Sequence, residues 1–460
     1  MNLAERLSDY AASLTYRDLA GARSGAVVSE AKKRLLDTLG CAIGACRESP
    51  LKAVARLAQT GYRSKAATVI GTGKKTTVDM ATFVNGAMIR YFDFNDTYLS
   101  KEPAHPSDNI SAVLATAEAE GRSGRDMLLA MTLAYEIQCR LCDAASLRHR
   151  GWDHVCYGLV SSALAAGKLM RLSKDELTQA VNISLNSHLA MRQVRAGELS
   201  EWKGFSFANA ARNAVFSALL AREGIGGPSP IFEGEMGFFR QVSGPFELDT
   251  QRFGGRDGTF KLEETFVKFF PAEYHSQSAI WAALDLRRSI GGDPRKEIAS
   301  VEVDTHEAGY TILGKDPEKW SPGTRETADH SLPYIVGLAL LEGRIDMGTY
   351  APRKIRDPEI REFVKKVIVG EDEALTAIYP HRISNRITVR LGDGRVLSKQ
   401  VDLPKGHPGN PMTTSEIEQK FRRLTKGILK ESQVDKVLDF VWTTEKQHDV
   451  SPLLEYCVVR

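Results

Sequence analysis

The first 220 residues of the chain carry apolar side chains at the spacing of α-helices. Over residues 28–39, Val, Leu and Ala recur with a 3.6-residue period, and Lys, Arg and Glu fill the positions between them. Ser173 and Glu176 have the Ser-x-x-Glu form of a capping box, and an apolar stripe follows over residues 177–183. Residues 204–220 are rich in Ala and Phe, as in a closely packed helix. The pattern predicts a helical N-terminal part.

The pattern changes to that of strands near residue 297. Residues 298–305 alternate as a β-strand does, and residues 382–391 and 395–403 flank a Gly-Asp-Gly turn as the two arms of a hairpin. Before this region, residues 223–258 are rich in Gly and Pro, which predicts a long irregular connection.

Helical spacing resumes after a loop at residues 405–411. Ser415 to Glu418 has the form of another capping box, and the helical pattern continues through Val441. We therefore predict a mainly α protein. A large all-helical domain, residues 1–269 and 405–460, is interrupted by a smaller α/β domain, residues 270–404.

Composition excludes several classes of protein. The 460 residues include 61 Lys and Arg against 58 Asp and Glu, a net charge of +3, so disorder driven by charge is excluded. The basic residues are scattered, which argues against a nucleic-acid partner. The longest apolar runs, such as residues 39–46, are far shorter than the ~20 residues that span a bilayer, so no membrane segment is expected.

The N-terminus and the cysteine content favour a cytoplasmic location. The chain starts without the basic and apolar regions of a secretory signal. Its six Cys are too sparse for a disulfide scaffold.

Familiar short motifs fail on their spacing. Residues 71–76 resemble the end of a phosphate-binding loop but lack its first Gly and its Ser or Thr, so a plain turn is expected. No Gly-x-Gly-x-x-Gly follows a predicted strand. Cys139 and Cys142 have the spacing of half a zinc site, but no second pair exists and core packing in a helix is the simpler interpretation.

The densest polar cluster covers residues 90–97 and 105–109. It holds Asp93, Asp96, Thr97 and His105 within fifteen residues. A His beside a carboxylate can act as a general acid or base, because the carboxylate fixes the tautomer of the ring. The alternative is a capped turn that carries a surface His.

Three further segments could hold an anionic ligand or move a proton. Arg192, Arg195 and Lys203 precede or begin an apolar helix; cations suit a polyanionic small molecule, although a solvated helix end is the alternative. Residues 268–276 combine Lys268 and His275 with a Glu and a Tyr near a predicted domain boundary, where ligand sites are common. The other candidates are the Asp-His-Ser-Leu-Pro-Tyr run that ends at Tyr334, and the lone His154, which by itself is more often structural.

These segments resemble the MmgE/PrpD family over nearly the whole chain. The similarity is carried by Phe-Val-Asn-Gly at 83–86, Asp-Phe-Asn-Asp-Thr at 93–97 and His-Pro-Ser at 105–107. Longer strings resemble the dehydratase branch of the family; they lie at residues 198–204, 232–235, 270–278 and 328–334.

The resemblance implies a helical domain with a smaller α/β lid domain, a homodimer and no metal cofactor. Carried over position by position, it implies an active site with seven side chains, which are Asp93, Thr97, His105, His154, Lys203, Lys268 and Tyr334. Arg192, Arg195 and His275 lie outside this set and are predicted to bind substrate, because a tricarboxylate needs several cationic partners.

The implied reaction is the loss of water from a β-hydroxy tricarboxylate such as 2-methylcitrate or citrate, which would serve propionate catabolism through the methylcitrate cycle. We expect His105, oriented by Asp93, to act as base or acid, with His154 and Tyr334 as candidates for the complementary proton transfer. Lys203 and Lys268 would stabilise the charge on the α-carboxylate. Decarboxylation of cis-aconitate, epimerisation of an aminodicarboxylate, and a catalytically silent binding protein stay open as alternatives.

Overall fold

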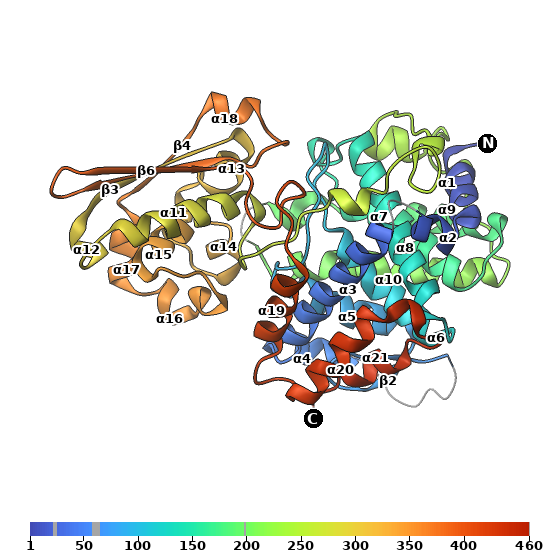
Figure 1. Ribbon diagram of the computed structural model, residues 1–460. Helices are drawn as coiled ribbons and strands as arrows, with labels where there is room; N and C mark the ends of the chain where they lie inside the picture. The colour runs from blue at the N-terminus through green and yellow to red at the C-terminus, as the bar shows by residue number, and fades with distance from the viewer. Residues whose placement is uncertain (22–24, 58–64, 197–198, 460) are drawn as a thin grey trace. The chain divides into compact units, whose positions relative to one another are not determined.

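The computed structural model describes residues 1–21, 25–57, 65–196 and 199–459, and they form two compact units. The helical unit comprises Met1–Phe266 and Thr413–Arg460, and the sheet unit comprises Val267–Met412. The borders thus fall after residues 266 and 412, where the sequence pattern suggested 269 and 404. In Figure 1 the colour follows residue number, so the two units can be identified from the colour bar.

The helical unit packs long helices around one another. They are α1 (Leu3–Ser13), α2 (Tyr16–Gly21), α3 (Ala26–Ala45), α4 (Ser49–Leu57), α5 (Val78–Tyr91), α6 (Ile110–Ala119), α7 (Gly124–Ala144), α8 (Val155–Leu169), α9 (Lys174–Ser187) and α10 (Trp202–Arg222). A short hairpin joins β1 (Ala67–Thr68) to β2 (Lys75–Thr76). The expected helix at 28–39 lies within α3, and the capping box of Ser173 and Glu176 is confirmed at the start of α9.

Small residues let α10 approach its neighbours closely. A Cβ atom on Gly158 of α8 would lie 2.5 Å from the ring of Phe207 on α10. A Cβ atom on Gly86 of α5 would lie 3.0 Å from the Cβ atom of Ala208, which also belongs to α10. Because larger side chains would overlap at these points, the small residues determine where α5 and α8 meet α10. Among the candidate side chains described below, His154 and Lys203 lie at the starts of α8 and α10, and Asp93 follows the end of α5.

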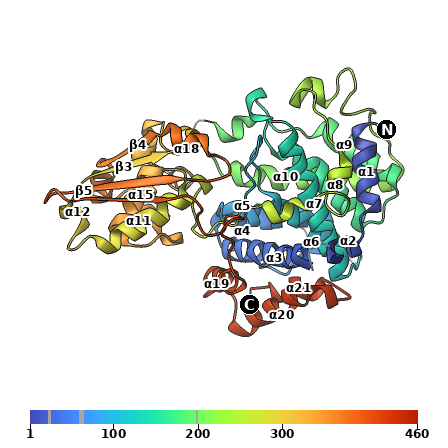
Figure 2. The ribbon, with the colours of Figure 1, turned by 45° about the horizontal axis from the view of Figure 1, so that its top comes forward.

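The C-terminal segment returns to α3. It forms α19 (Thr414–Thr425), α20 (Glu431–Trp442) and α21 (Ser451–Tyr456), and both α19 and α20 pack against α3. Figures 1 and 2 show these helices beside α3 from two directions. The second capping box was placed two residues late: Thr413, rather than Ser415, caps α19 and pairs with Glu416. Both residues can cap a helix, so the composition alone did not choose between them.

The sheet unit contains a mixed four-stranded sheet in the order β4-β3-β5-β6. β3 (Ile298–Thr305) runs parallel to β4 (Val367–Glu371) and antiparallel to β5 (Asn385–Leu391), and β5 forms the expected hairpin with β6 (Val396–Val401). The helices of this unit are α11 (Gln277–Ser289), α12 (Pro294–Glu297), α13 (Glu307–Leu313), α14 (Arg325–Ala328), α15 (Leu332–Glu342), α16 (Pro352–Ile355), α17 (Pro358–Val364) and α18 (Glu373–Ala377).

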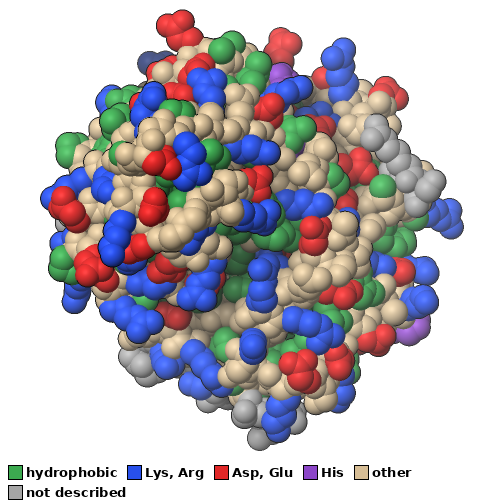
Figure 3. All heavy atoms as spheres, turned by 60° about the vertical axis from the view of Figure 1, so that its left-hand side comes forward, with side chains coloured by type: hydrophobic (Ala, Val, Ile, Leu, Met, Phe, Trp, Pro, Cys, Tyr) green, Lys and Arg blue, Asp and Glu red, His purple; other side chains and the backbone are tan. Residues whose placement is uncertain are grey.

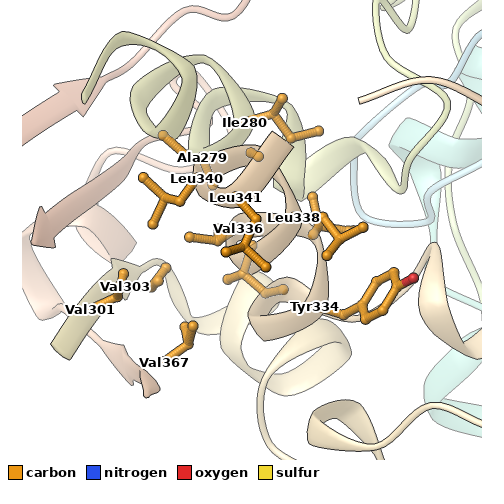
Figure 4. Close-up of a cluster of buried hydrophobic side chains, with 14 of the residues drawn as sticks. Ala279, Ile280, Val301, Val303, Tyr334, Val336, Leu338, Leu340, Leu341 and Val367 are labelled. Carbon is orange, nitrogen blue, oxygen red and sulfur yellow. The ribbon is translucent and has the colours of Figure 1, made fainter. Parts of the chain in front are cut away.

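An apolar core joins α11 and α15 to the sheet. Figure 4 shows Val301 and Val303 of β3, Val367 of β4 and Leu340 of α15 in this cluster. The mainly α fold class with a small α/β part is therefore confirmed.

The two cysteines with the spacing of half a zinc site are core residues of a helix. Cys139 and Cys142 are buried in α7 with free thiols.

None of the helices in the described part of the chain is long and apolar enough to span a membrane. Lys and Arg side chains are spread over the face seen in Figure 3, with Asp and Glu between them.

Candidate active site

The loop that follows α5 has strained backbone at its first acidic residue. Asp93 has φ = 48°, in the left-handed region that few residues other than Gly adopt. Its amide donates to the carbonyl oxygen of Arg90, so the strained turn is tied to the end of the helix. Strain of this kind costs energy and is concentrated at functional sites, which marks the loop as a candidate.

Two cations hold the Asp93 carboxylate. Arg90 contacts Oδ1 through Nη1, and Lys203, at the start of α10, donates from Nζ to Oδ2 at 3.2 Å. All three side chains are buried. Two buried cations, from the end of α5 and the start of α10, therefore meet at one carboxylate.

A second buried carboxyl lies on the other side of Arg90. Asp108, in the 3₁₀ helix Pro106–Asn109, has Oδ2 3.6 Å from Nε of Arg90. Asn95 donates from Nδ2 to Asp108 Oδ1 and to the Ser107 hydroxyl, both at 2.8 Å. Burial raises the pKa of Asp108 to about 7, although Arg90 opposes the shift. This carboxyl therefore changes its charge near neutral pH.

The His105 ring is held by backbone at one nitrogen. Its Nδ1 lies 2.7 Å from the carbonyl oxygen of Asp96. Because a carbonyl oxygen only accepts, Nδ1 keeps its hydrogen and Nε2 is the nitrogen that exchanges a proton. The carboxylate of Asp93 was expected to orient this ring, but the contact at Nδ1 comes from the backbone of Asp96.

His154 forms a buried dyad with its neighbour in sequence. At the start of α8, Nδ1 of His154 lies 2.8 Å from Oδ1 of Asp153, whose Oδ2 lies 3.0 Å from Nε of Arg195. Nη2 of Arg195 is 3.5 Å from Nε2 of His154. Burial lowers the pKa of His154, and Arg195 lowers it further against the opposing effect of Asp153. His154 is therefore a neutral imidazole at pH 7, with its hydrogen on Nδ1.

The two histidines lie side by side. Their ring centroids are 5.7 Å apart with an edge-on arrangement. Two positive imidazoles so close would repel each other. The lone-histidine interpretation of His154 thus gives way to a paired one.

The segment after α9 brings cations to His154. Asp153 donates its amide to the carbonyl oxygen of Ala190, and Arg192 donates its amide to that of Gly151. This contact places the 3₁₀ helix Arg192–Arg195 beside the dyad. Glu198, the first residue of the string at 198–204, lies outside the described residues, as does Gly197.

Thr97 has a positioning contact. Its hydroxyl donates to the carbonyl oxygen of Ala104 at 3.0 Å, and its backbone pairs with Phe266. These contacts hold both ends of the short segment, residues 97–104, that precedes His105.

The sheet unit holds a second polar cluster. His275 places Nδ1 2.8 Å from Oε1 of Glu273 and Nε2 3.3 Å from the hydroxyl of Tyr379. Burial opposes ionisation of Glu273, but His275 and, less strongly, Lys268 lower its pKa to about 2. Lys268 itself is buried. The ring of His306 stacks on Tyr379 at a centroid distance of 4.6 Å.

Tyr334 has a different environment from the other candidates. Its hydroxyl donates to the carbonyl oxygen of Thr349 at 2.9 Å, and its ring belongs to the apolar cluster of the sheet unit (Figure 4). Burial raises its pKa above the ordinary value of a phenol. Its proton is therefore committed to a structural hydrogen bond.

The structure adds side chains that the sequence did not single out. Asp153 directly precedes His154, and Asp108 lies within the polar cluster at residues 105–109, so both positions were a usable signal. Tyr379 is 104 residues from its partner His275, so no local pattern could have found it. Among the described residues, no group of three or more His, Cys, Asp or Glu side chains could hold a metal ion.

In the helical unit, four of the seven predicted residues lie in two contacting pairs, and a fifth, Thr97, lies in the loop between Asp93 and His105. Asp93 with Lys203 forms an ionic pair, His105 with His154 forms an imidazole pair, and Thr97 closes the intervening loop. A base, an acid and several cations around a buried corner can remove a proton next to a carboxylate and protonate a leaving hydroxyl.

Comparison with known proteins gives the same family over both parts of the chain. Residues 5–251 match the model of the MmgE/PrpD N-terminal domain, and residues 270–446 match that of the MmgE/PrpD C-terminal domain.

Curated relatives cover most of the chain. The 2-methylcitrate dehydratase of Cupriavidus necator is 34% identical over 406 residues, 84% of this chain and 83% of that protein. The 2-methylcitrate dehydratase of Escherichia coli K12 is 34% identical over 399 residues, covering 81% and 80%. The mitochondrial 2-methylcitrate dehydratase of Yarrowia lipolytica is 30% identical over 442 residues, covering 90% and 83%.

Proposed function

Because the chain belongs to the MmgE/PrpD family, we propose that it is a hydro-lyase that removes water from a β-hydroxy tricarboxylate. 2-Methylcitrate is the favoured substrate, with 2-methyl-cis-aconitate as the product, because relatives at 30–34% identity carry that activity in their names. The observation that carries the proposal is the His105–His154 pair in the helical unit, with Arg195 beside His154.

His154 is assigned as the base. Asp153 keeps the hydrogen on Nδ1, so the lone pair on Nε2 is the one that accepts a proton. Its lowered pKa leaves the ring neutral at pH 7. The proton it takes is the one on the carbon next to a carboxylate, and the electrons of that C–H bond become the new double bond.

His105 is assigned as the acid. Burial and the neighbouring Arg195 disfavour a second hydrogen on His154, which leaves His105 as the member of the pair assigned to donate a proton. The carbonyl oxygen of Asp96 accepts the hydrogen on Nδ1, so Nε2–H is the group that protonates the departing hydroxyl. Water leaves, and the protons on the two rings then return to the starting arrangement through solvent.

The cations bind and polarise the carboxylates. As the α-proton leaves, negative charge spreads onto the adjacent carboxylate, and preorganised cations stabilise that charge. Lys203 is one such cation, because Asp93 holds its ammonium group in the buried corner. Arg192 and Arg195 suit a further carboxylate, for which a guanidinium offers two parallel donors.

The sheet unit supplies candidates of its own. Lys268 is proposed to stabilise charge on the substrate on the strength of the family resemblance, and His275 to bind substrate because it lies in the same buried cluster. The role of this unit as a lid, the homodimer and the cytoplasmic location stay predictions.

Incubation of the purified protein with a panel of substrates tests the proposal. With a chelator present, 2-methylcitrate and citrate should each be followed by the rise in ultraviolet absorbance of an alkene conjugated to a carboxylate. Faster turnover of 2-methylcitrate than of citrate would support the assigned substrate. Carbon dioxide release from cis-aconitate would instead support a decarboxylase, and a change in optical rotation of an aminodicarboxylate without a new alkene would support an epimerase.

A further inference from the structure

Asp96 makes two kinds of contact at once. Its backbone carbonyl oxygen receives Nδ1–H of His105 at 2.7 Å. Its carboxylate accepts from the hydroxyl of Tyr135 at 2.7 Å and from the amide of Ser107 at 3.0 Å. Nε of Arg34 lies 3.8 Å from the same carboxylate, and the Asp96 side chain has no exposed surface. A fully buried carboxylate has thus been satisfied by donors from three directions.

These donors come from rigid parts of the helical unit. Tyr135 lies in the middle of α7, where its side chain is fully buried. Arg34 lies in α3 and is itself fixed, because it donates to the hydroxyl and the carbonyl oxygen of Thr265 at 2.9 and 3.1 Å. The loop from Asp93 to Thr97 has no helix or strand hydrogen bonds of its own except at its end, so its geometry depends on such external contacts.

We propose that Asp96 is a positioning residue for His105: the buried carboxylate, anchored by Tyr135 and Arg34, aims the carbonyl oxygen of the same residue at Nδ1. The carboxylate does not meet the substrate in this account. It acts through the backbone, and it leaves Nε2 of His105 as the position at which the proton is exchanged. This role rests on the proposed function only where turnover is the readout.

A purely structural role would have a different consequence. If the contacts of Asp96 only stabilised the fold, weakening them would lower the melting temperature and leave the protonation of His105 unchanged. If the contacts of Asp96 position His105, weakening them would also change which ring nitrogen of His105 carries the hydrogen. The two roles therefore separate in a measurement on the ring itself.

Tyr135→Phe is the mildest test, because it removes one oxygen atom from a buried side chain. Tyr10→Phe is the matched control: Tyr10, on helix α1, is equally buried, and its hydroxyl donates to the carbonyl oxygen of Gly254 at 2.8 Å. Both variants lose one buried hydrogen bond, and because the acceptor of Tyr135 is a carboxylate, we expect the larger decrease in melting temperature in Tyr135→Phe. Only Tyr135→Phe should slow turnover, with a loss in kcat that reaches roughly 10- to 100-fold, as expected for a misplaced catalytic group, and with KM changed less than twofold.

Nitrogen-15 NMR of the imidazoles provides the readout that needs no substrate. The chain has ten His, and the signals of His105 are identified as those missing from the His105→Gln spectrum. In the wild type and in Tyr10→Phe, Nδ1 of His105 should carry its hydrogen and Nε2 should not at high pH. In Tyr135→Phe we expect a mixture of the two tautomers, and Asp96→Asn should give a larger change in the same direction.

The outcomes separate the two proposals. A single unchanged tautomer in both Tyr135→Phe and Asp96→Asn would overturn the positioning role, whatever the activity. If the wild type turned over no tricarboxylate but the tautomer changed as expected, the positioning role would stand and the proposed function would fail. Equal losses of kcat in Tyr135→Phe and Tyr10→Phe would also contradict the positioning role.

Discussion

Nζ of Lys420 donates to the carbonyl oxygen of Phe94 at 2.8 Å, within the loop that carries Asp93. The ammonium group also lies 3.8 Å from the centroid of the Phe94 ring and 2.6 Å from Oδ1 of Asp37. Lys420 belongs to α19, which follows the sheet unit in sequence. The C-terminal segment therefore completes the support of a loop that lies 326 residues earlier in the chain.

Loss of Lys420 should weaken both the fold and the reaction. Lys420→Met leaves Asp37 as a buried charge without its ionic partner, and breaking such a pair costs roughly 3–5 kcal/mol of the free energy of unfolding. The double variant Asp37→Asn/Lys420→Met removes the unpaired charge and should recover much of this stability in denaturant titrations. Activity should stay low in the double variant, because the Phe94 carbonyl oxygen has lost this donor. Full activity in the double variant would show that the loop does not depend on Lys420.

His105→Ala should lose most turnover and stay folded. General acid catalysis contributes about 10²–10⁴-fold, and the turnover number should fall within that range. Circular dichroism and the melting temperature check the fold, and His149→Ala, at an exposed position, serves as the control. A folded and fully active His105→Ala protein would remove His105 from the mechanism.

Lys268→Ala tests the contribution of the sheet unit. If Lys268 stabilises charge on the substrate, kcat/KM should fall by about 10²–10³-fold, as when one preorganised donor is removed. Because the side chain is buried next to Glu273, the variant also needs a stability measurement. Wild-type kinetics in the folded variant would restrict Lys268 to a structural role.

The pH profile should report the base. His154 must be neutral to accept a proton, and its pKa is lowered from 6.5, so the acidic limb of kcat/KM should have its midpoint below pH 6.5. Arg195 contributes to that lowering. Arg195→Gln should therefore move the acidic limb to higher pH, whereas Arg192→Gln, on the same short helix, should raise KM and leave the limb in place. A limb that moves to lower pH in Arg195→Gln would rule out His154 as the base.

Tyr334→Phe should leave catalysis nearly unchanged. The hydroxyl donates to the Thr349 carbonyl oxygen, so its loss removes one buried hydrogen bond, worth about 1 kcal/mol of the free energy of unfolding. Steady-state kinetics of the variant measures the change in turnover, and denaturant unfolding measures the change in the free energy of unfolding. If turnover instead slowed by roughly 100-fold or more, which is the contribution of a general acid, Tyr334 would be restored as a proton donor.

The regular elements were predictable because their signals are local. Periodicity over residues 28–39 and 298–305 marked α3 and β3, and the Gly-Asp-Gly turn marked the hairpin of β5 and β6. The start of α19 was displaced by two residues because both Thr413 and Ser415 can cap a helix. The local sequence pattern therefore predicted where an element lies more accurately than it predicted the first residue of that element.

The candidate site was only partly predictable, because its partners are distant in sequence. The sequence suggested His105 and His154 separately, but their pairing depends on how α8 lies against the loop after α5. Arg195 reaches Asp153 only because the segment after α9 pairs with residues 151–153. Tyr334 was predicted from the family resemblance, and its apolar surroundings come from the tertiary fold.

Proton NMR of 2-methylcitrate incubated with the wild type and with His154→Gln, both with chelator present, tests the central claim most directly. We predict that the wild type converts the methyl doublet of the substrate into a singlet on a double bond, and that folded His154→Gln does so at least about 100-fold more slowly, as expected for loss of a general base. A wild-type protein that leaves the doublet of 2-methylcitrate and the signals of citrate unchanged would contradict the dehydratase proposal. Equal conversion by both proteins would contradict the role of His154.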